Sequence, residues 1–209
     1  MSTDKLIGNL CNELEPVKKC CHPSMCLALW AVISLAYIGG MIWLMGLRHD
    51  FDARLMDPAF LFEVSLITLL GAASVACTFW LRVPDMRGAK WMLPVPFTLI
   101  AVYGLWMGIR AFTFNIDMPE MKFHHCMKEG ALIVMFPAVF MFFTVFKGCT
   151  TRPVLMSFMN AFGIASVGYL ALRLTCASEN IGHVFYAHLM PLIIVGTFVG
   201  FLARRLYKW

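Results

Sequence analysis

The chain has few charged residues: Asp, Glu, Lys and Arg make up 14% of its 209 residues, whereas 60% are hydrophobic. A water-soluble domain usually carries roughly 25% charged residues. The shortage of charge therefore excludes an ordinary soluble core and favours a membrane domain. The net charge of +5 is spread over links and both termini. Because no basic arm is formed, we expect no direct contact with nucleic acid.

Motifs of common enzyme sites are also missing from the sequence. There is no nucleophile elbow, phosphate-binding loop, HExxH motif or dinucleotide fingerprint. Eight cysteines are present, but none form a CxxC pair, which argues against a membrane thiol oxidoreductase. We therefore expect a protein that is not an enzyme.

Long uncharged apolar runs are what the sequence has in abundance. Residues 25–47 contain no charge, and about 20 apolar residues suffice to cross a bilayer as a helix. Five further apolar runs occupy residues 59–81, interrupted only by Glu63, and residues 91–109, 130–146, 153–172 and 184–203, the last with one histidine. Because lipid tolerates no open sheet edge, the predicted fold class is all-α. We expect a polytopic membrane protein of six transmembrane helices with short loops and a short cytoplasmic N-terminal helix.

The distribution of Lys and Arg predicts how the six spans are oriented. Eleven of these residues lie in the two termini and the even-numbered links, against six on the opposite side. Positive residues favour the cytoplasmic side, so both termini should be cytoplasmic. This gives three parts: a cytoplasmic tail at 1–24, a transmembrane domain at 25–203 and a cytoplasmic C-terminal tail at 204–209.

The N-terminal tail carries one amphipathic pattern. Leu6, Ile7, Leu10 and Leu14 have helical spacing, and the predicted helix ends near Pro16. So short a helix is marginal in water and needs a surface to lie on. That surface is either the lipid interface or a groove on a soluble protein, and the mixed charge of the polar face favours the groove.

Two cysteines fall on the outer side of the predicted membrane domain, with histidines beside them. Cys126 follows two histidines in the third link, and Cys176 begins the fifth link. Three readings are open: a disulfide or redox pair, a site for zinc or another soft metal, or unconnected side chains. The redox pair is favoured, because two isolated cysteines in an oxidising compartment usually pair. The candidate sensing residues are Cys126, Cys176, His183, His188, His124 and His125.

Three ionisable residues fall in the outer halves of spans. Arg110 and Arg173 lie near their helix ends, so their long side chains are expected to snorkel to the interface. Glu63 has a shorter side chain and lies one turn inside, so we expect a buried partner for it: Arg110, Arg173 or His188. The same residues could instead line a proton or ion path.

The order of these features resembles the negative regulator of sigma F (NrsF) family. The motifs are Thr3 to Ile7, Leu14 to Val17, Glu63 opening the second span, Cys126 before the fourth, Pro137 within it, Arg152-Pro153, Cys176, and Arg204-Arg205 to Trp209. The resemblance implies an anti-sigma factor of the bacterial inner membrane. Its cytoplasmic tail would sequester an extracytoplasmic-function sigma factor. The outer cysteines would register metal or oxidative stress.

A small ion-coupled transporter or channel is the alternative function. It would use Glu63 and the arginines as a pathway, but the six spans show no evident inverted repeat. We therefore predict a stress-responsive anti-sigma factor in the lipid bilayer, with no established cofactor and with zinc or another soft metal as the candidate ligand of the outer face.

Overall fold

The computed structural model describes residues 21–84, 86–113, 124–146, 148, 150–191 and 193–198, together with residues 3 and 5. Every regular element in these ranges is a helix, and no strand occurs in them. The predicted tail residues Leu6, Ile7, Leu10 and Leu14 lie outside the described residues, as does the segment 204–209. The all-α fold class is confirmed.

Six helices are long and apolar enough to cross a membrane. Five of them are α2 (Pro23–Met45), α4 (Pro58–Leu81), α5 (Pro94–Thr113), α6 (His124–Phe146) and α7 (Pro153–Thr175). The sixth begins as α8 (Ile181–His183), continues as the π-helical η2 (Val184–Leu189) and reaches Phe198. Two shorter elements, α3 (Phe51–Arg54) and the 3-10 helix η1 (Met86–Met92), lie in the links.

Large apolar side chains cover the outside of the bundle. Exposed examples on four different helices are Val32, Trp43, Leu105 and Phe198. A water-soluble monomer rarely exposes so much contiguous apolar surface. Together with the six long helices, this surface indicates a membrane protein.

Proline and polar caps set where the helices start. α2, α4, α5 and α7 all begin at a proline, a position where the missing N–H costs nothing. Asp57 caps α4 by accepting a hydrogen bond from Ala59 N at 2.9 Å. α2 ends before Gly46, whose φ of 86° suits glycine.

One boundary differs from the prediction in a way that matters for the site. α6 begins at His124 rather than near residue 130, so Cys126 lies in the first turn of a helix and not in a link. The apolar run underestimates the helix because Lys128 and Glu129 interrupt it. Polar residues are tolerated at the membrane–water interface, so a spanning helix can extend past its apolar segment.

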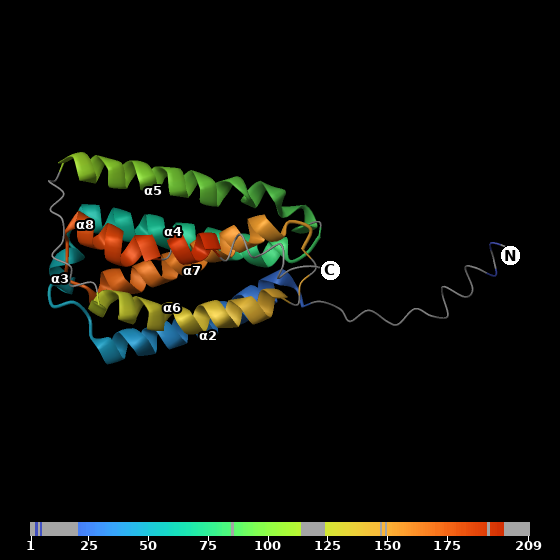
Figure 1. Cartoon of the computed structure of the whole chain (residues 1–209), viewed down its shortest axis with the longest axis horizontal. Helices are drawn as coiled ribbons and strands as arrows, with labels where there is room; N and C mark the ends of the chain where they lie inside the picture. The colour runs from blue at the N-terminus through green and yellow to red at the C-terminus, as the bar shows by residue number, and fades with distance from the viewer. Residues whose placement is uncertain are drawn as a thin grey trace.

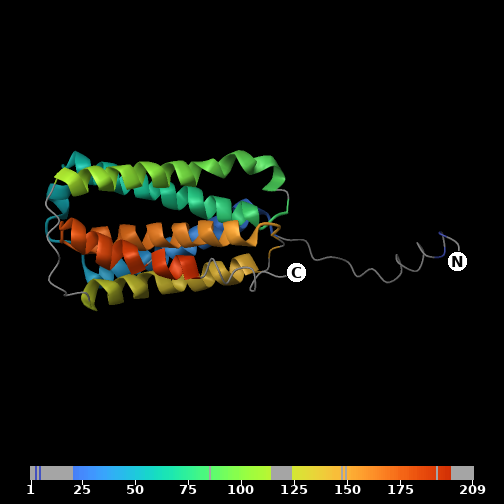
Figure 2. The same cartoon turned by 45° about the horizontal axis from the view of Figure 1, so that its top comes forward.

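α4 and α7 form the centre of the bundle, and the other spans surround them (Figure 1). Small residues let their backbones approach closely. A Cβ at Gly163 of α7 would lie 2.7 Å from Val75 of α4, and one at Gly71 would lie 3.0 Å from Ser166. The bundle thus has two ends, which Figure 2 shows from a second direction. We call them the α3 end, where α3 and α8 lie, and the η1 end.

Candidate metal centre

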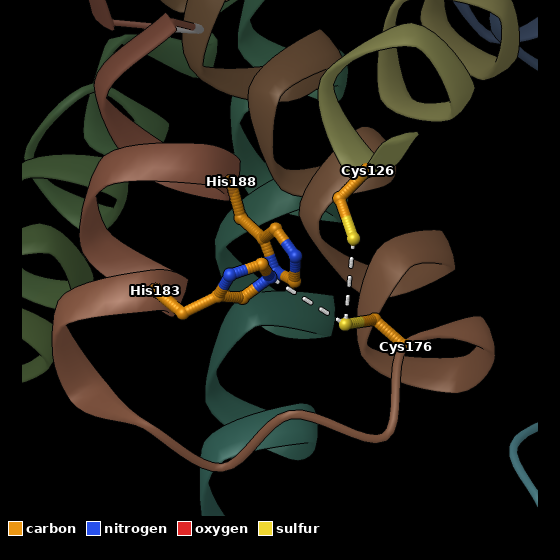
Figure 3. A group of neighbouring side chains, drawn as sticks. All are labelled: Cys126, Cys176, His183 and His188. Atoms are coloured by element: carbon orange, nitrogen blue, oxygen red, sulfur yellow. Dashed lines mark hydrogen bonds between the residues drawn. The ribbon is translucent and has the colours of Figure 1, made fainter. Parts of the chain in front are cut away.

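Four metal-ligating side chains converge at the α3 end (Figure 3). Cys126 comes from the first turn of α6 and Cys176 from the residue after α7, while His183 and His188 come from the sixth span. One ligand atom from each lies within 4.8 Å of all the others. Three separate segments of the chain therefore build one site.

A π-helical segment aims both histidines at this site. In an α-helix of 3.6 residues per turn, residues five apart would point about 140° away from each other. Here Met190 N donates to Phe185 O, five residues back, and such bonds stack residues five apart. His183 and His188 consequently face the same way, with ring centroids 5.1 Å apart. Asn180 accepts from His183 N at 3.2 Å and fixes the start of α8.

Two of the ligand-atom distances fit tetrahedral coordination, and the remaining ones, all within 4.8 Å, would have to shorten slightly around an ion. With Zn–S bonds of about 2.3 Å and Zn–N bonds of about 2.05 Å, ligand atoms lie about 3.8 Å apart for S···S and about 3.6 Å for S···N. The Cys126 and Cys176 sulfurs lie 3.6 Å apart, and Cys176 Sγ lies 3.6 Å from His183 Nε2. Two thiolates and two imidazoles are a donor set that zinc and softer metals prefer.

His188 supplies a second indication of a ligand. Its side chain is 1% exposed, and neither ring nitrogen makes a hydrogen bond to the described part of the chain. Buried polar atoms are nearly always partnered, so such a histidine needs an explanation. A metal ion between His188 and the cysteines would provide the missing partner.

The two thiols of the site are chemically unequal. Cys126 Sγ donates to Cys176 Sγ, and this contact, together with the nearby His188 ring, lowers the pKa of the Cys176 thiol. The thiolate is the form that binds metals and attacks oxidants. The lowered pKa marks Cys176 as the thiol that we expect to ionise more readily.

A charge cluster lies beside the metal-ligating residues. Glu63 is fully buried and accepts from Arg110 at 2.6 Å, forms an ion pair with Arg173 at 3.0 Å and accepts from the Tyr169 hydroxyl. Glu179 pairs with Arg173 at 3.3 Å and accepts from Arg48 at 2.7 Å. We call this set the ion cluster; it comprises Arg48, Arg54, Arg110, Arg173, Asp50, Asp57, Glu63 and Glu179.

Neighbouring arginines favour the ionised form of two acids of the ion cluster, Glu179 and Asp50. Burial alone would raise the pKa of Glu179, but the charge of Arg173 and the hydrogen bond from Arg48 keep it below its ordinary value. The hydrogen bond from Arg48 likewise lowers the pKa of Asp50. Both carboxylates are therefore fully charged near neutral pH.

The predicted sensing residues are only partly visible in this site. Cys126, Cys176, His183 and His188 come together. His124 and His125 are the first two residues of α6, and the positions of their side chains lie outside what the structure describes. The sulfurs are free thiols at 3.6 Å, so the redox pair favoured from sequence is not bonded here.

The intramembrane residues differ in part from the prediction. Glu63 has two of the three partners expected for it, Arg110 and Arg173. The expectation that both arginines snorkel is wrong for Arg173, which is 1% exposed. An inward ion pair is preferred because Glu63 would otherwise be a buried unpaired charge.

Sequence reasoning placed Arg48 and Glu179 on the outer side but missed them as members of the ion cluster. Arg48 directly follows the first apolar run yet is 3% exposed, and Glu179 lies in the five-residue link between Thr175 and Ile181. Only their positions in the sequence could have indicated a role: Glu179 lies between the predicted ligands Cys176 and His183, and Arg48 lies on the same side of the membrane.

Known proteins give a consistent picture of what the chain is. The family model described as "Negative regulator of sigma F" matches residues 10–209. A curated protein from Azospira oryzae, the "Probable anti-sigma-F factor NrsF", is 26% identical over 178 residues, which cover 81% of each chain. No solved structure matches. The chain belongs to the negative regulator of sigma F (NrsF) family, a family of anti-sigma factors.

Proposed function

We propose that this chain holds an extracytoplasmic-function sigma factor inactive through residues 1–24 and releases it when a soft metal ion occupies the Cys126–Cys176–His183–His188 centre. The observation that carries the proposal is the convergence of four ligand atoms within 4.8 Å. A site for two sulfurs and two imidazole nitrogens favours zinc and softer divalent ions over magnesium or calcium, which prefer oxygen.

The orientation in a bacterial inner membrane follows from charge. Eleven of the seventeen Lys and Arg residues lie on the side of the termini, so we place the α3 end in the periplasm and the tail in the cytoplasm. The metal centre would then sample ions outside the cytoplasm. The tail would be accessible to a soluble sigma factor.

Oxidation of the two thiols is a second candidate signal, favoured by the 3.6 Å separation of the sulfurs. A peroxide would take two electrons and two protons from Cys126 and Cys176, forming one disulfide and being reduced to water or an alcohol. The more acidic Cys176 thiol would attack first. The two signals share the cysteines but not the histidines.

Histidine variants therefore separate the signals. Full-length protein in detergent, carrying its captured sigma factor, is treated with Zn²⁺ or with a peroxide, and the released sigma factor is measured. Cys176→Ser should abolish release by both agents. His188→Gln should abolish release by Zn²⁺ but retain release by peroxide, at a lower rate because His188 helps to lower the pKa of the Cys176 thiol. His49→Gln is the matched control, because His49 is exposed at the same end.

If the unmodified protein releases the sigma factor with peroxide but not with Zn²⁺, oxidation replaces metal binding as the proposed signal. Release by neither agent would contradict both.

The tail is tested by one substitution in its apolar stripe. If Leu6, Ile7, Leu10 and Leu14 fill a groove on the sigma factor, Leu10→Asp buries an unpaired charge there. Such a charge costs several kcal/mol, and each 1.4 kcal/mol is about tenfold in affinity. Capture of the sigma factor should collapse at normal protein level. Lys5→Ala, off the stripe, should capture it normally; retention by Leu10→Asp would refute groove docking.

A further inference from the structure

Arg48 is hydrogen-bonded to the segment that carries Cys176. The residue lies three positions beyond the end of α2, and its side chain is fully buried. Arg48 Nη2 donates to Ala177 O at 3.3 Å and to Glu179 Oε1 at 2.7 Å, after the cysteine. On the other side of the cysteine, Arg48 N donates to Leu174 O at 3.0 Å. The segment that follows α2 is therefore hydrogen-bonded to the chain on both sides of Cys176, one of the metal-ligating residues.

α2 is also fastened to the helix that carries the other cysteine. Tyr37 OH donates to Leu132 O of α6 at 2.8 Å, and Trp30 Nε1 donates to Pro137 O of α6 at 3.1 Å. α2 therefore contacts both segments whose sulfurs approach within 3.6 Å at the α3 end.

The rest of α2 is weakly embedded. Its buried residues form a single stripe, whereas Leu29, Val32, Leu35 and Trp43 are exposed. Lipid is as apolar as these side chains, so a shift of α2 against the bilayer loses little hydrophobic energy. The helix is about 35 Å long at 1.5 Å per residue, and its first two residues, Pro23 and Ser24, are the last two of the tail segment 1–24.

We propose that Arg48 couples the metal centre to α2, and that α2 carries the signal across the membrane to the tail. This proposal rests on the proposed function. Drawing Cys126 and Cys176 around one ion fixes α6 relative to the 176–180 link. Because α2 is bonded to both, it must move with them. Arg48 is a positioning residue here, since it contacts no ligand atom of the centre itself.

The shape of its side chain explains why an arginine can hold this link together. A guanidinium presents five donors in a rigid fork, so one residue can bond Asp50, Glu179 and a backbone carbonyl together. A lysine at this position would keep the charge but could satisfy fewer of these acceptors.

The test compares Arg48→Gln and Arg48→Lys with a matched control, Arg54→Gln. Arg54 is also an arginine of the ion cluster and lies 3.6 Å from Glu179, but it makes no bond to the backbone of the 176–180 link. For each full-length protein, three quantities are measured: Zn²⁺ affinity, sigma-factor binding without Zn²⁺, and the fraction of sigma factor released at saturating Zn²⁺.

Arg48→Gln should bind Zn²⁺ within about threefold of the unmodified affinity and hold the sigma factor, but release at least tenfold less of it. Arg48→Lys should be intermediate, and Arg54→Gln should release normally. Hydrogen exchange at the start of α2 should respond to Zn²⁺ in the unmodified protein and in Arg54→Gln, but not in Arg48→Gln. Zn²⁺ binding by each variant shows that it has folded.

Two outcomes would overturn the coupling role of Arg48 and leave the proposed function standing. One is normal release of the sigma factor by Arg48→Gln. The other is an equal loss of release in Arg54→Gln, which would assign the effect to the loss of any positive charge from the ion cluster. If Arg48→Gln does not bind Zn²⁺, the residue builds the centre rather than transmitting from it, and the proposal is again wrong. Failure of the unmodified protein to bind Zn²⁺ contradicts the proposed function instead, so the two failures are distinct.

Discussion

The two ends of the bundle bury arginine in different ways. At the α3 end, Arg173 pairs with Glu63 and Glu179. At the η1 end, Arg82 is 7% exposed, and its Nε and Nη1 atoms have no hydrogen-bond partner in the described ranges. The comparison teaches that burial alone does not tell what a charged side chain contributes. Ion pairs link several segments at the α3 end, whereas the described part of the chain shows no comparable ion pair for Arg82.

The largest effect should come from removing the shared acid of the α3 end. Glu63→Gln removes the buried one of the two carboxylates that Arg173 and Arg110 share, the other being Glu179, and breaking a buried pair costs about 3–5 kcal/mol. Thermal or denaturant unfolding in detergent measures the loss. Asp52→Asn, on an exposed residue of α3, is the control and should change stability by under about 0.5 kcal/mol. Equal stability of the two variants would contradict a structural role for the pair.

Metal should stabilise the α3 end further. At free Zn²⁺ one hundred times the dissociation constant, binding to the folded state adds about 2.7 kcal/mol to the apparent stability. The unfolding temperature should therefore rise with Zn²⁺ in the unmodified protein and stay constant in Cys176→Ser. A similar rise in both would place the ion somewhere else.

Acid should weaken the α3 end next. The pKa values of Asp50 and Glu179 are lower in the folded protein than their ordinary values of 3.8 and 4.5. Their contribution is fully present above the ordinary values and is lost as the pH falls through the lower folded values. Unfolding temperatures measured from pH 7 downward should drop below about pH 4.5. Glu179→Gln should flatten part of that drop, and an unchanged profile would argue against the ion pairs.

The smallest effect should come from Arg82. Within the described ranges two of its three guanidinium nitrogens, Nε and Nη1, have no hydrogen-bond partner, so Arg82→Met should change stability by under about 1 kcal/mol or increase it. Arg173→Met, at the paired end, should lose several times more. A large loss at Arg82 would mean that a residue outside the described ranges pairs with it.

Much of the fold follows from the sequence because lipid imposes a simple rule. A segment in hydrocarbon must bond its own backbone and expose apolar side chains, so the uncharged runs predict the six helices. The start of α6 could not be found this way, since its first turns are polar. Hydropathy identifies the part of a helix that contacts lipid, so it does not detect polar helix ends that extend into the membrane–water interface.

The site was only partly predictable, for a geometrical reason. Residue types and membrane side brought Cys126, Cys176, His183 and His188 into one hypothesis, and the structure brings these four together. The orientation of both histidine side chains toward the site depends on a π-helical turn, which no local residue pattern predicts. Two partners of Arg48, Ala177 and Glu179, lie more than a hundred residues away in sequence, so tertiary structure alone reveals them.

The ion cluster also determines how ions reach the α3 end. Its four arginines are matched by four carboxylates, so the cluster has no net charge and produces little long-range field. A divalent cation would be neither drawn in nor repelled from a distance, unlike substrates of proteins whose charged clefts steer diffusion. The rate of metal capture should accordingly depend only weakly on ionic strength. Discrimination among metals would come from sulfur and nitrogen donors at contact.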